Sequence, residues 1–440
     1  MYIPSFLNLL QIHFSQLEPA HSEFGVDRHQ PSNRNHFNNL GTLSPYHSGP
    51  HVPEVSLNLP SDCTVDQVML VSCFTRLSNP MKCLTFCSVE PKLHRHGSRG
   101  PEYEKGTIAQ LADTLDHARD VIQKANLPPN LRFLKEGYEY RLVPEALTII
   151  GRQQLFDHGV EFALRYPTFS TDRVISSPVQ RVVDSSHYFA QAFFGREVDN
   201  VTFLTVDDLD DPVSWITPWK FCPKYSEEPY RKTSSILSIG DIHGALYACP
   251  YDLAARNASP WCNVFLPHEL RALEYEYDVL MDGVSGHAGR GDPGPVLGAF
   301  YIQKLIERFT NATGDAKSLY LEFGHDTSIL LPLSTMGLNK DDAPLTPYHM
   351  RSHRRFRTSE QVPFAANMIW EKFTCKNSFK GPQIRLLLNE EPLPLSICQR
   401  SGKDRRFGSC ALAEFVKSNE FSTSISYGGE IWNATCEHDV

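Results

Sequence analysis

At residues 95–101 the chain reads Arg-His-Gly-Ser-Arg-Gly-Pro. Two guanidinium groups flank an imidazole, and arginine is the side chain best suited to bind two phosphate oxygens at once. Gly97 lets a ligand approach the backbone closely, and His96 is placed to attack a phosphorus atom and form a covalent bond. A solvated basic turn is the alternative, which the rarity of five such fixed positions disfavours. The heptapeptide therefore predicts a phosphate site with a histidine nucleophile.

Residues 318–326 contain a second candidate element, in which a predicted strand leads into a His-Asp pair. The run 318–323 alternates in the manner of a strand and leads directly into Gly324, His325 and Asp326. A histidine can help to neutralise a phosphate, and an aspartate can donate a proton to a leaving alkoxide. Alone, such a pair is more typical of a capped turn. It becomes specific because it follows the heptapeptide in the same chain.

A third candidate lies in a helix with clear boundary signals. Ser177 can cap this helix, Pro178 suits its first position and Gly195 suits its end. Arg181 then lies in the first turn. The family resemblance given below implies that Arg181 is a third phosphate-binding arginine, with Arg173 as the alternative.

Elsewhere, strands interleaved with helices predict an α/β fold. Further strands are predicted at 65–71 and 383–388, and further helices at 107–125, 144–166 and 364–373. Residues 205–235 are predicted to form a loop, and the glycine-rich stretch 283–298 a turn-rich crossing.

The heptapeptide, the helix with its arginine and the His-Asp pair resemble, in this order along the chain, the histidine acid phosphatases, the family that includes fungal phytases. The resemblance covers residues 39–440. It implies that His96 is the nucleophile and Asp326 the proton donor, and that no metal or cofactor is needed. It assigns phosphate binding to four residues: Arg95, Arg99, Arg181 and His325.

The resemblance also implies the architecture. We expect a central, mostly parallel sheet flanked by helices, as in phosphoglycerate mutases, with a smaller, mainly α-helical domain inserted. The large domain is expected at 40–185 and 295–440, the smaller one at 186–294, and a disordered leader at 1–39.

One segment departs from the family pattern. The strand before the heptapeptide should lead directly into it, but residues 72–93 separate Val71 from His94. Deleting these 22 residues joins Val-Met-Leu-Val to His-Arg-His-Gly. We interpret the segment as a translated intron or another spurious insert, with a real surface loop as the alternative. A genuine insert would separate the strand from the nucleophile and place activity in doubt.

The chain contains 11 cysteines, and three of them, Cys73, Cys83 and Cys87, lie in that segment. Sequence alone leaves the pairing of the other eight open. The resemblance implies four bridges: Cys63–Cys375, Cys222–Cys436, Cys249–Cys262 and Cys398–Cys410. Four glycosylation sequons begin at Asn200, Asn257, Asn311 and Asn433. Bridges and sequons together predict an extracellular protein, although the start of the chain lacks a convincing signal peptide.

Composition narrows the function classes. The chain has 440 residues, 41% hydrophobic and 21% charged, which is a globular balance. Its net charge of −9 argues against nucleic acid as the main partner, and no apolar run is long enough to span a membrane. The expected partner is a small phosphate ester.

The leading hypothesis is a secreted acid phosphatase that forms a phosphohistidine, with phytate as one candidate substrate. Glu102 and Glu104, and Met281 where phytases often carry lysine, weaken the phytate case because a polyphosphate favours basic surroundings. The alternatives are an inactive phosphate-binding relative disabled by the insert, mutase-like phosphate transfer, and a metallophosphoesterase. The last reading rests on Gly-Asp-Ile-His-Gly at 240–244, where Asp241 and His243 would be metal ligands, but the other motifs of that class do not occur.

Overall fold

The computed structural model describes residues 37–69, 90–140, 142–225, 240–288 and 293–436. Within these ranges nine strands form one sheet in the order β4-β3-β5-β2-β1-β6-β7-β8, with β9 beside β7. The strands are β1 (Cys63–Met69), β2 (Glu90–Arg95), β3 (Arg173–Ser176), β4 (Thr202–Thr205), β5 (Tyr320–Gly324), β6 (Asn367–Cys375), β7 (Gln383–Leu388), β8 (Glu391–Leu393) and β9 (Ser409–Ala411). Strands β1 to β5 pair in parallel, whereas β6 to β9 pair antiparallel. The predicted α/β fold with a mostly parallel central sheet is confirmed.

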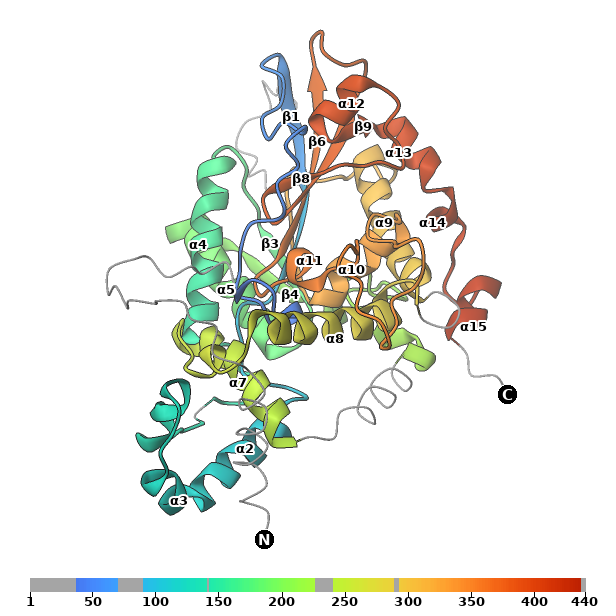
Figure 1. Ribbon diagram of the computed structural model, residues 1–440. Helices are drawn as coiled ribbons and strands as arrows, with labels where there is room; N and C mark the ends of the chain where they lie inside the picture. Colours follow the sequence, from blue (N-terminus) through green and yellow to red (C-terminus); the bar gives the residue numbers. More distant parts are fainter. Residues whose placement is uncertain (1–36, 70–89, 141, 226–239, 289–292, 437–440) are drawn as a thin grey trace.

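Helices cover both faces of this sheet (Figure 1). One face packs against α4 (Ile149–Arg165) and α5 (Gln180–Phe194), and the other against α8 (Pro267–Ser285), α9 (Pro293–Thr310) and α10 (Asp326–Thr335). Because successive strand residues point to opposite faces, Val174 joins the first core and Ile175 the second. Shorter helices complete this part of the fold: α11 (Thr358–Gln361), α12 (Gly402–Phe407), α13 (Leu412–Ser418), α14 (Glu420–Ser424) and α15 (Glu430–Cys436).

A separate hydrophobic cluster holds the helices that lie away from the sheet (Figure 1). It combines α2 (Lys105–His117), α3 (Arg119–Lys124) and the 3-10 helix η3 (Pro129–Lys135) with α7 (Gly240–Arg256) and part of α8. Packing therefore places 105–135 with the smaller helical unit and β4 in the sheet, which differs from the predicted boundaries of 186–294. The predicted helix 107–125 is divided into α2 and α3 at Ala118.

The prediction of a helix at 364–373 is wrong, because this segment carries β6. The strand is central, and most of its residues are buried on both faces of the sheet. The apolar residues at 364–366, 368–370 and 373 recur at spacings that suit a helix as well as a strand buried on both sides, so periodicity does not distinguish the two. The strand at 383–388 is confirmed as β7. In the predicted loop at 205–235, the structure describes three short 3-10 helices: η5 (Val206–Asp208), η6 (Pro218–Phe221) and η7 (Pro223–Tyr225).

Strands β1 and β2 pair with consecutive stretches of β6. Val68 in β1 faces Glu371, and Lys92 in β2 faces Ile369. In an antiparallel pair the partner number falls by one as the strand advances by one residue. A strand that continued from Val68 without interruption would therefore place residue 69 opposite Trp370 and residue 70 opposite Ile369. Residue 92 lies there instead, which makes the chain 22 residues longer than this strand line requires.

The expected insert at 72–93 has the same length, but its boundaries need correction. Residues 90–93 belong to β2, and β2 runs directly into His96 through hydrogen bonds to β5 and β6. The strand and the heptapeptide are therefore not separated. Most of the segment, residues 70–89, lies outside the described residues, together with Cys73, Cys83 and Cys87.

Of four disulfides, two link distant parts of the chain and two close short loops. They join Cys63 to Cys375, Cys222 to Cys436, Cys249 to Cys262 and Cys398 to Cys410. These are the pairs that the family resemblance implies. Among the described helices, none is long and apolar enough to cross a membrane.

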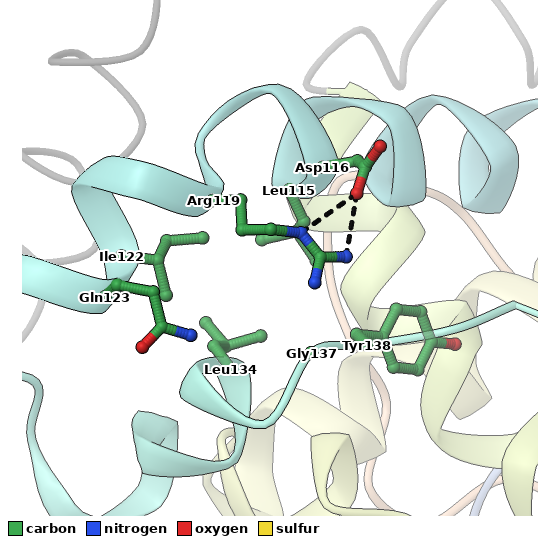
Figure 2. A pocket seen from close by; sticks show the side chains of 8 residues that line it. All are labelled: Leu115, Asp116, Arg119, Ile122, Gln123, Leu134, Gly137 and Tyr138. Carbon is green, nitrogen blue, oxygen red and sulfur yellow. Dashed lines mark hydrogen bonds and ion pairs between the residues drawn. The ribbon is translucent and has the colours of Figure 1, made fainter.

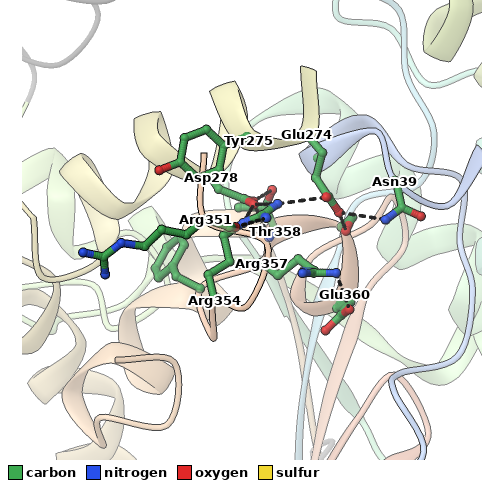
Figure 3. A network of polar contacts seen from close by, with 12 residues as sticks. Asn39, Glu274, Tyr275, Asp278, Arg351, Arg354, Arg357, Thr358 and Glu360 are labelled. Carbon is green, nitrogen blue, oxygen red and sulfur yellow. Dashed lines mark hydrogen bonds and ion pairs between the residues drawn. The ribbon is translucent and has the colours of Figure 1, made fainter. Parts of the chain in front are cut away.

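A buried polar cluster, which we call the Arg354 network, ties α8 to the segment before α11 (Figure 3). Arg354 donates to Asp278 through Nε and to Glu274 through Nη2, the latter at 2.8 Å. The backbone and hydroxyl of Thr358 also donate to Asp278, each at 2.7 Å. Burial raises the pKa of Asp278 to about 7, an effect that Arg354 opposes and Glu274 increases. Each carboxyl oxygen of Asp278 and Glu274 therefore accepts at least one hydrogen bond.

Candidate active site

Three parallel strands end at the same edge of the sheet, and the predicted residues follow them. Strands β3, β5 and β2 are neighbours, and they end at Ser176, Gly324 and Arg95. The backbone N–H of His96 donates to the carbonyl of Gly324 at 3.2 Å. The carboxyl edge of a parallel sheet is where α/β proteins place their ligands.

The helix α4 begins against the heptapeptide and fixes its path. A Cβ atom on Gly97 would lie 2.3 Å from the carbonyl oxygen of Gly151, and one on Gly151 would lie 2.1 Å from that of Ser98. Thr148 caps α4 and also donates to the carbonyl of Ser98 at 3.0 Å. Glycine is required at both positions because the two backbones are in contact.

His96 is buried and held in one orientation. Its Nδ1 lies 2.9 Å from the carbonyl oxygen of Gly97. A carbonyl only accepts, so Nδ1 carries the proton and Nε2 keeps its lone pair. Burial, followed by the charges of Arg181, Arg95 and Arg99, lowers the pKa of His96 well below its usual value. The imidazole is therefore neutral and able to act as a nucleophile.

Arg95 is fully buried beneath the site. Its Nη1 donates to the carbonyls of Thr42, at 2.6 Å, and Val362, and its Nη2 lies 2.9 Å from a carboxylate oxygen of Asp326. Burial lowers the pKa of Arg95 to about 10, which leaves the side chain charged. Its guanidinium carbon also lies 4.8 Å from the ring centre of Phe364.

Arg99 and Arg181 lie on either side of one carboxylate. Oε2 of Glu102 is 3.0 Å from Nη2 of Arg99 and 2.9 Å from Nη2 of Arg181. Burial and the charge of Arg99 lower the pKa of Arg181. For Arg99 burial acts in the same direction, but Tyr251 and Glu102 outweigh it and the pKa is raised.

The His-Asp pair completes the site from the end of β5. The ring of His325 lies edge-on to that of His96, with 5.8 Å between ring centres, and its Nε2 is 3.0 Å from the hydroxyl of Ser177. Burial and Arg181 lower the pKa of His325 to about 3. Burial raises the pKa of Asp326, but Arg95 and His325 outweigh it and the net shift is downward.

We call this group the arginine site: Arg95, His96, Arg99, Arg181, His325 and Asp326. The structure brings together all six residues that the sequence analysis selected. Within the described residues, the buried Nε atoms of Arg95 and Arg181 have no hydrogen-bond acceptor. Buried donors without an acceptor are costly, and an anion with several oxygens would satisfy them. The arrangement is that of an oxyanion site around a neutral histidine.

Two features differ from the sequence analysis. Helix α5 begins at Gln180, so Ser177 does not cap it, and the hydroxyl contacts His325 instead. Gly195 does end the helix, with φ of 55°. The contact of Glu102 with Arg181 was missed, because these residues are 79 positions apart; an acid next to the heptapeptide is the only sequence signal for it.

The alternative metal motif lies elsewhere. Asp241 is in the first turn of α7 and accepts a hydrogen bond from Thr114 at 3.1 Å, and His243 stacks on Tyr247. In the described part of the chain, no group of three His, Cys, Asp or Glu side chains is placed to hold a metal ion.

A small surface hollow, partly open to solvent, lies among α2, α3 and η3 (Figure 2). None of the six residues of the arginine site lines it. Its arginine, Arg119, forms an ion pair with Asp116 at 2.8 Å. The hollow therefore differs from the arginine site, where the Nε atoms of Arg95 and Arg181 have no acceptor among the described residues.

Comparisons with known proteins agree with this geometry. The chain is 26% identical to a thiamine-repressible acid phosphatase of Schizosaccharomyces pombe, over 96% of this chain and 94% of the relative. It is 28% identical to phytase A of Arthroderma benhamiae, over 76% and 83% of the two chains. Its fold resembles the crystal structure of the phytase from D. castellii, with a TM-score of 0.66, 20% identity, and coverage of 95% and 93%.

The family model of the histidine phosphatase superfamily (branch 2) matches residues 92–234 and 219–389, which include the heptapeptide, Arg181 and the His-Asp pair. The chain therefore belongs to the histidine phosphatase superfamily, branch 2.

Proposed function

We propose that this chain hydrolyses phosphomonoesters through a phosphohistidine on His96. The observation that carries the proposal is the state of His96, which is neutral, has its Nδ1 bound to Gly97 and lies among three arginines. Relatives named acid phosphatase and phytase support the same reaction class. An inactive relative is disfavoured because β2 keeps its register with β5 and β6 up to the nucleophile.

The first step transfers the phosphoryl group to the protein. Arg95, Arg99 and Arg181 bind the phosphate oxygens and reduce the repulsion that a nucleophile meets. The lone pair of Nε2 on His96 attacks phosphorus, and the bond from phosphorus to the ester oxygen breaks. The electron pair goes to that oxygen, which takes a proton from Asp326 and leaves as an alcohol. The immediate product is a phosphohistidine.

The second step regenerates the histidine. A water molecule attacks the phosphorus, Asp326 accepts a proton from it, and the bond between phosphorus and Nε2 breaks. Inorganic phosphate then leaves. The step consumes one water molecule and returns His96 and Asp326 to their starting states.

The proton on Asp326 depends on the bound phosphate. In the free protein Arg95 and His325 hold the pKa of Asp326 below its usual value. A phosphate dianion takes up the charge of Arg95 and repels the carboxylate, so binding raises that pKa. Acidic solution supplies the proton more readily, which accounts for an expected acidic optimum.

We further propose that the protein is extracellular. Four disulfides are typical of oxidising compartments. The sequon residues Asn200, Asn257 and Asn311 are exposed and Asn433 is partly exposed, so a glycan could be attached at these positions.

The proposal is tested with p-nitrophenyl phosphate from about pH 3 to about pH 7, with and without EDTA. We expect EDTA-resistant hydrolysis that His96→Ala reduces by about 10⁴-fold or more. Glu414→Gln is the matched control, because it removes a charge from the remote pair with Arg400. Loss of activity in EDTA would favour the metal motif at Asp241 and His243, and full activity in His96→Ala would refute the proposal.

A further inference from the structure

Glu102 directly follows the heptapeptide, and its carboxylate occupies contacts that a phosphate would use. A single oxygen, Oε2, lies within 3.0 Å of Arg99 and 2.9 Å of Arg181. An oxygen shared by two guanidinium groups is a common arrangement for a bound phosphate. The carboxylate and a substrate phosphate therefore compete for the same two side chains.

We propose that Glu102 determines substrate specificity as an internal counter-ion. A substrate phosphate displaces its carboxylate from Arg99 and Arg181, and the displaced charge stays beside the site and disfavours substrates with further phosphates. This inference rests on the proposed phosphatase function. It predicts a preference for esters with one phosphate over myo-inositol hexakisphosphate.

The surroundings allow the Glu102 side chain to move while its backbone stays in place. The side chain is 21% exposed, whereas those of Arg99 and Arg181 are 8% and 9% exposed. The backbone N–H of Glu102 donates to Glu104 at 3.3 Å. Glu104 in turn accepts hydrogen bonds from Tyr251 at 2.8 Å and Tyr277 at 2.6 Å. Rotation of one side chain toward solvent is thus sufficient to remove the Glu102 contacts of both arginines, while Nη1 of Arg181 stays 3.6 Å from Glu145.

Charges beside the arginines act in the same direction. Glu145 is 45% exposed and lies 3.6 Å from Nη1 of Arg181. The nearby cation Lys105 is already paired with Glu145, at 3.5 Å. A second phosphate placed beside Arg181 would meet these two carboxylates, and Lys220, whose charge acts on His325, is the cation that opposes them. Like charges brought together in this way lower affinity selectively.

Two variants of Glu102 distinguish its competition with phosphate for the two arginines from the effect of its negative charge on further phosphates. Glu102→Gln keeps the shape and removes the charge, so the inhibition constant of orthophosphate should fall roughly tenfold, as expected when one charge near a bound anion is removed. The ratio of kcat/KM for hexakisphosphate to that for p-nitrophenyl phosphate should rise roughly tenfold. Glu102→Asp keeps the charge but shortens the reach to the two arginines. It should tighten orthophosphate binding and leave the substrate ratio near that of the wild type.

Glu414→Gln is again the matched control and should change neither quantity. An unchanged or weaker affinity for orthophosphate in both Glu102 variants, with wild-type thermal unfolding, would overturn the role of Glu102 and leave the phosphatase proposal standing. A wild-type chain that neither hydrolyses p-nitrophenyl phosphate nor is stabilised by orthophosphate would overturn both.

Discussion

Two buried clusters of arginine and carboxylate in this molecule have opposite properties. In the arginine site three guanidinium groups surround His96, and Asp326 is the one carboxylate among the six residues. In the Arg354 network one guanidinium serves two buried carboxylates, Asp278 and Glu274. The same residue types thus occur as three guanidinium groups with one carboxyl group in one place and as one with two in the other.

Hydrogen bonding separates the two clusters further. Every nitrogen of the Arg354 guanidinium donates: Nε to Asp278, Nη1 to the carbonyl of Arg351 and Nη2 to Glu274. In the arginine site the buried Nε atoms of Arg95 and Arg181 have no acceptor in the described part of the chain. A cluster with complete hydrogen bonding stabilises the fold, whereas a cluster with buried donors to spare is prepared for a ligand.

The pKa shifts follow from the same difference. The excess of positive charge adds to burial in lowering the pKa of His96. In the network, burial and Glu274 raise the pKa of Asp278 to about 7 despite Arg354. The first cluster holds a deprotonated base, and the second holds a proton on a carboxyl group. Substitutions in the two clusters should therefore affect different properties.

After His96→Ala, the largest effect is expected from Asp326→Asn, measured with two leaving groups. An alkyl phosphate requires a proton on its leaving oxygen, whereas p-nitrophenolate leaves readily as the anion. We expect kcat to fall about 10³-fold for glycerol phosphate and about tenfold for p-nitrophenyl phosphate.

The comparison between the two substrates, made below the unfolding temperature of the variant, is the control, because loss of the charge that faces buried Arg95 lowers stability but affects both substrates equally. Equal losses of activity on the two substrates would show that Asp326 does not donate the proton.

An intermediate effect is expected from Asp278→Asn, on stability rather than on activity. Because the folded pKa of about 7 lies above the usual 3.8, the folded chain holds a proton that the unfolded chain has released. The stabilisation is complete below about pH 4 and is lost as the pH rises to about 7. Between these limits the free energy of unfolding of the wild type should fall by on the order of a few kcal/mol relative to that of the variant. Urea unfolding at each pH measures this difference.

Asp208→Asn provides a control in which the free energy of unfolding depends on pH in the opposite direction. Hydrogen bonds from the backbone and hydroxyl of Thr205 lower the pKa of this exposed carboxylate. Its contribution to stability is therefore lost as the pH falls through the folded pKa, at the acid end of the range. If the Asp278 variant shows the same dependence on pH as the wild type, the network does not hold a proton near neutrality.

The arginine site was largely predictable from sequence because its residues lie in short motifs at strand ends and at the start of a helix. The heptapeptide, the His-Asp pair and Arg181 each carry a local signal, and parallel strands bring these signals to one edge. Two contacts had no such signal. Ser177 reaches His325 across 148 positions, and Glu102 reaches Arg181 across 79. Such contacts depend on tertiary packing, which residue spacing does not encode.

The fold was predictable in class but less so in its parts. Strand β6 was taken for a helix because both its faces are buried. The predicted boundaries of the smaller domain did not include α2, which packs against α7 more than a hundred residues away. Local periodicity shows that an element has an apolar face, but it does not show which distant element covers that face.

The smallest effect is expected from deletion of residues 72–93, which tests whether either cluster needs this segment. In the shortened chain, Leu70 and Val71 would take the places of Lys92 and Leu93 beside β5 and β6 and continue the line of β1. Activity on p-nitrophenyl phosphate should stay within about threefold of the wild type.

The matched control is deletion of residues 73–93, one residue fewer. This change shifts the register by one position and turns every following side chain of the strand to the other face, so His96 would leave its place between Gly324 and Ala365. Activity should be lost in this variant and kept in the other. If both deletions behave alike, the continuous strand line is not what positions the nucleophile, and the contacts of Gly97 with α4 must be sufficient to hold it.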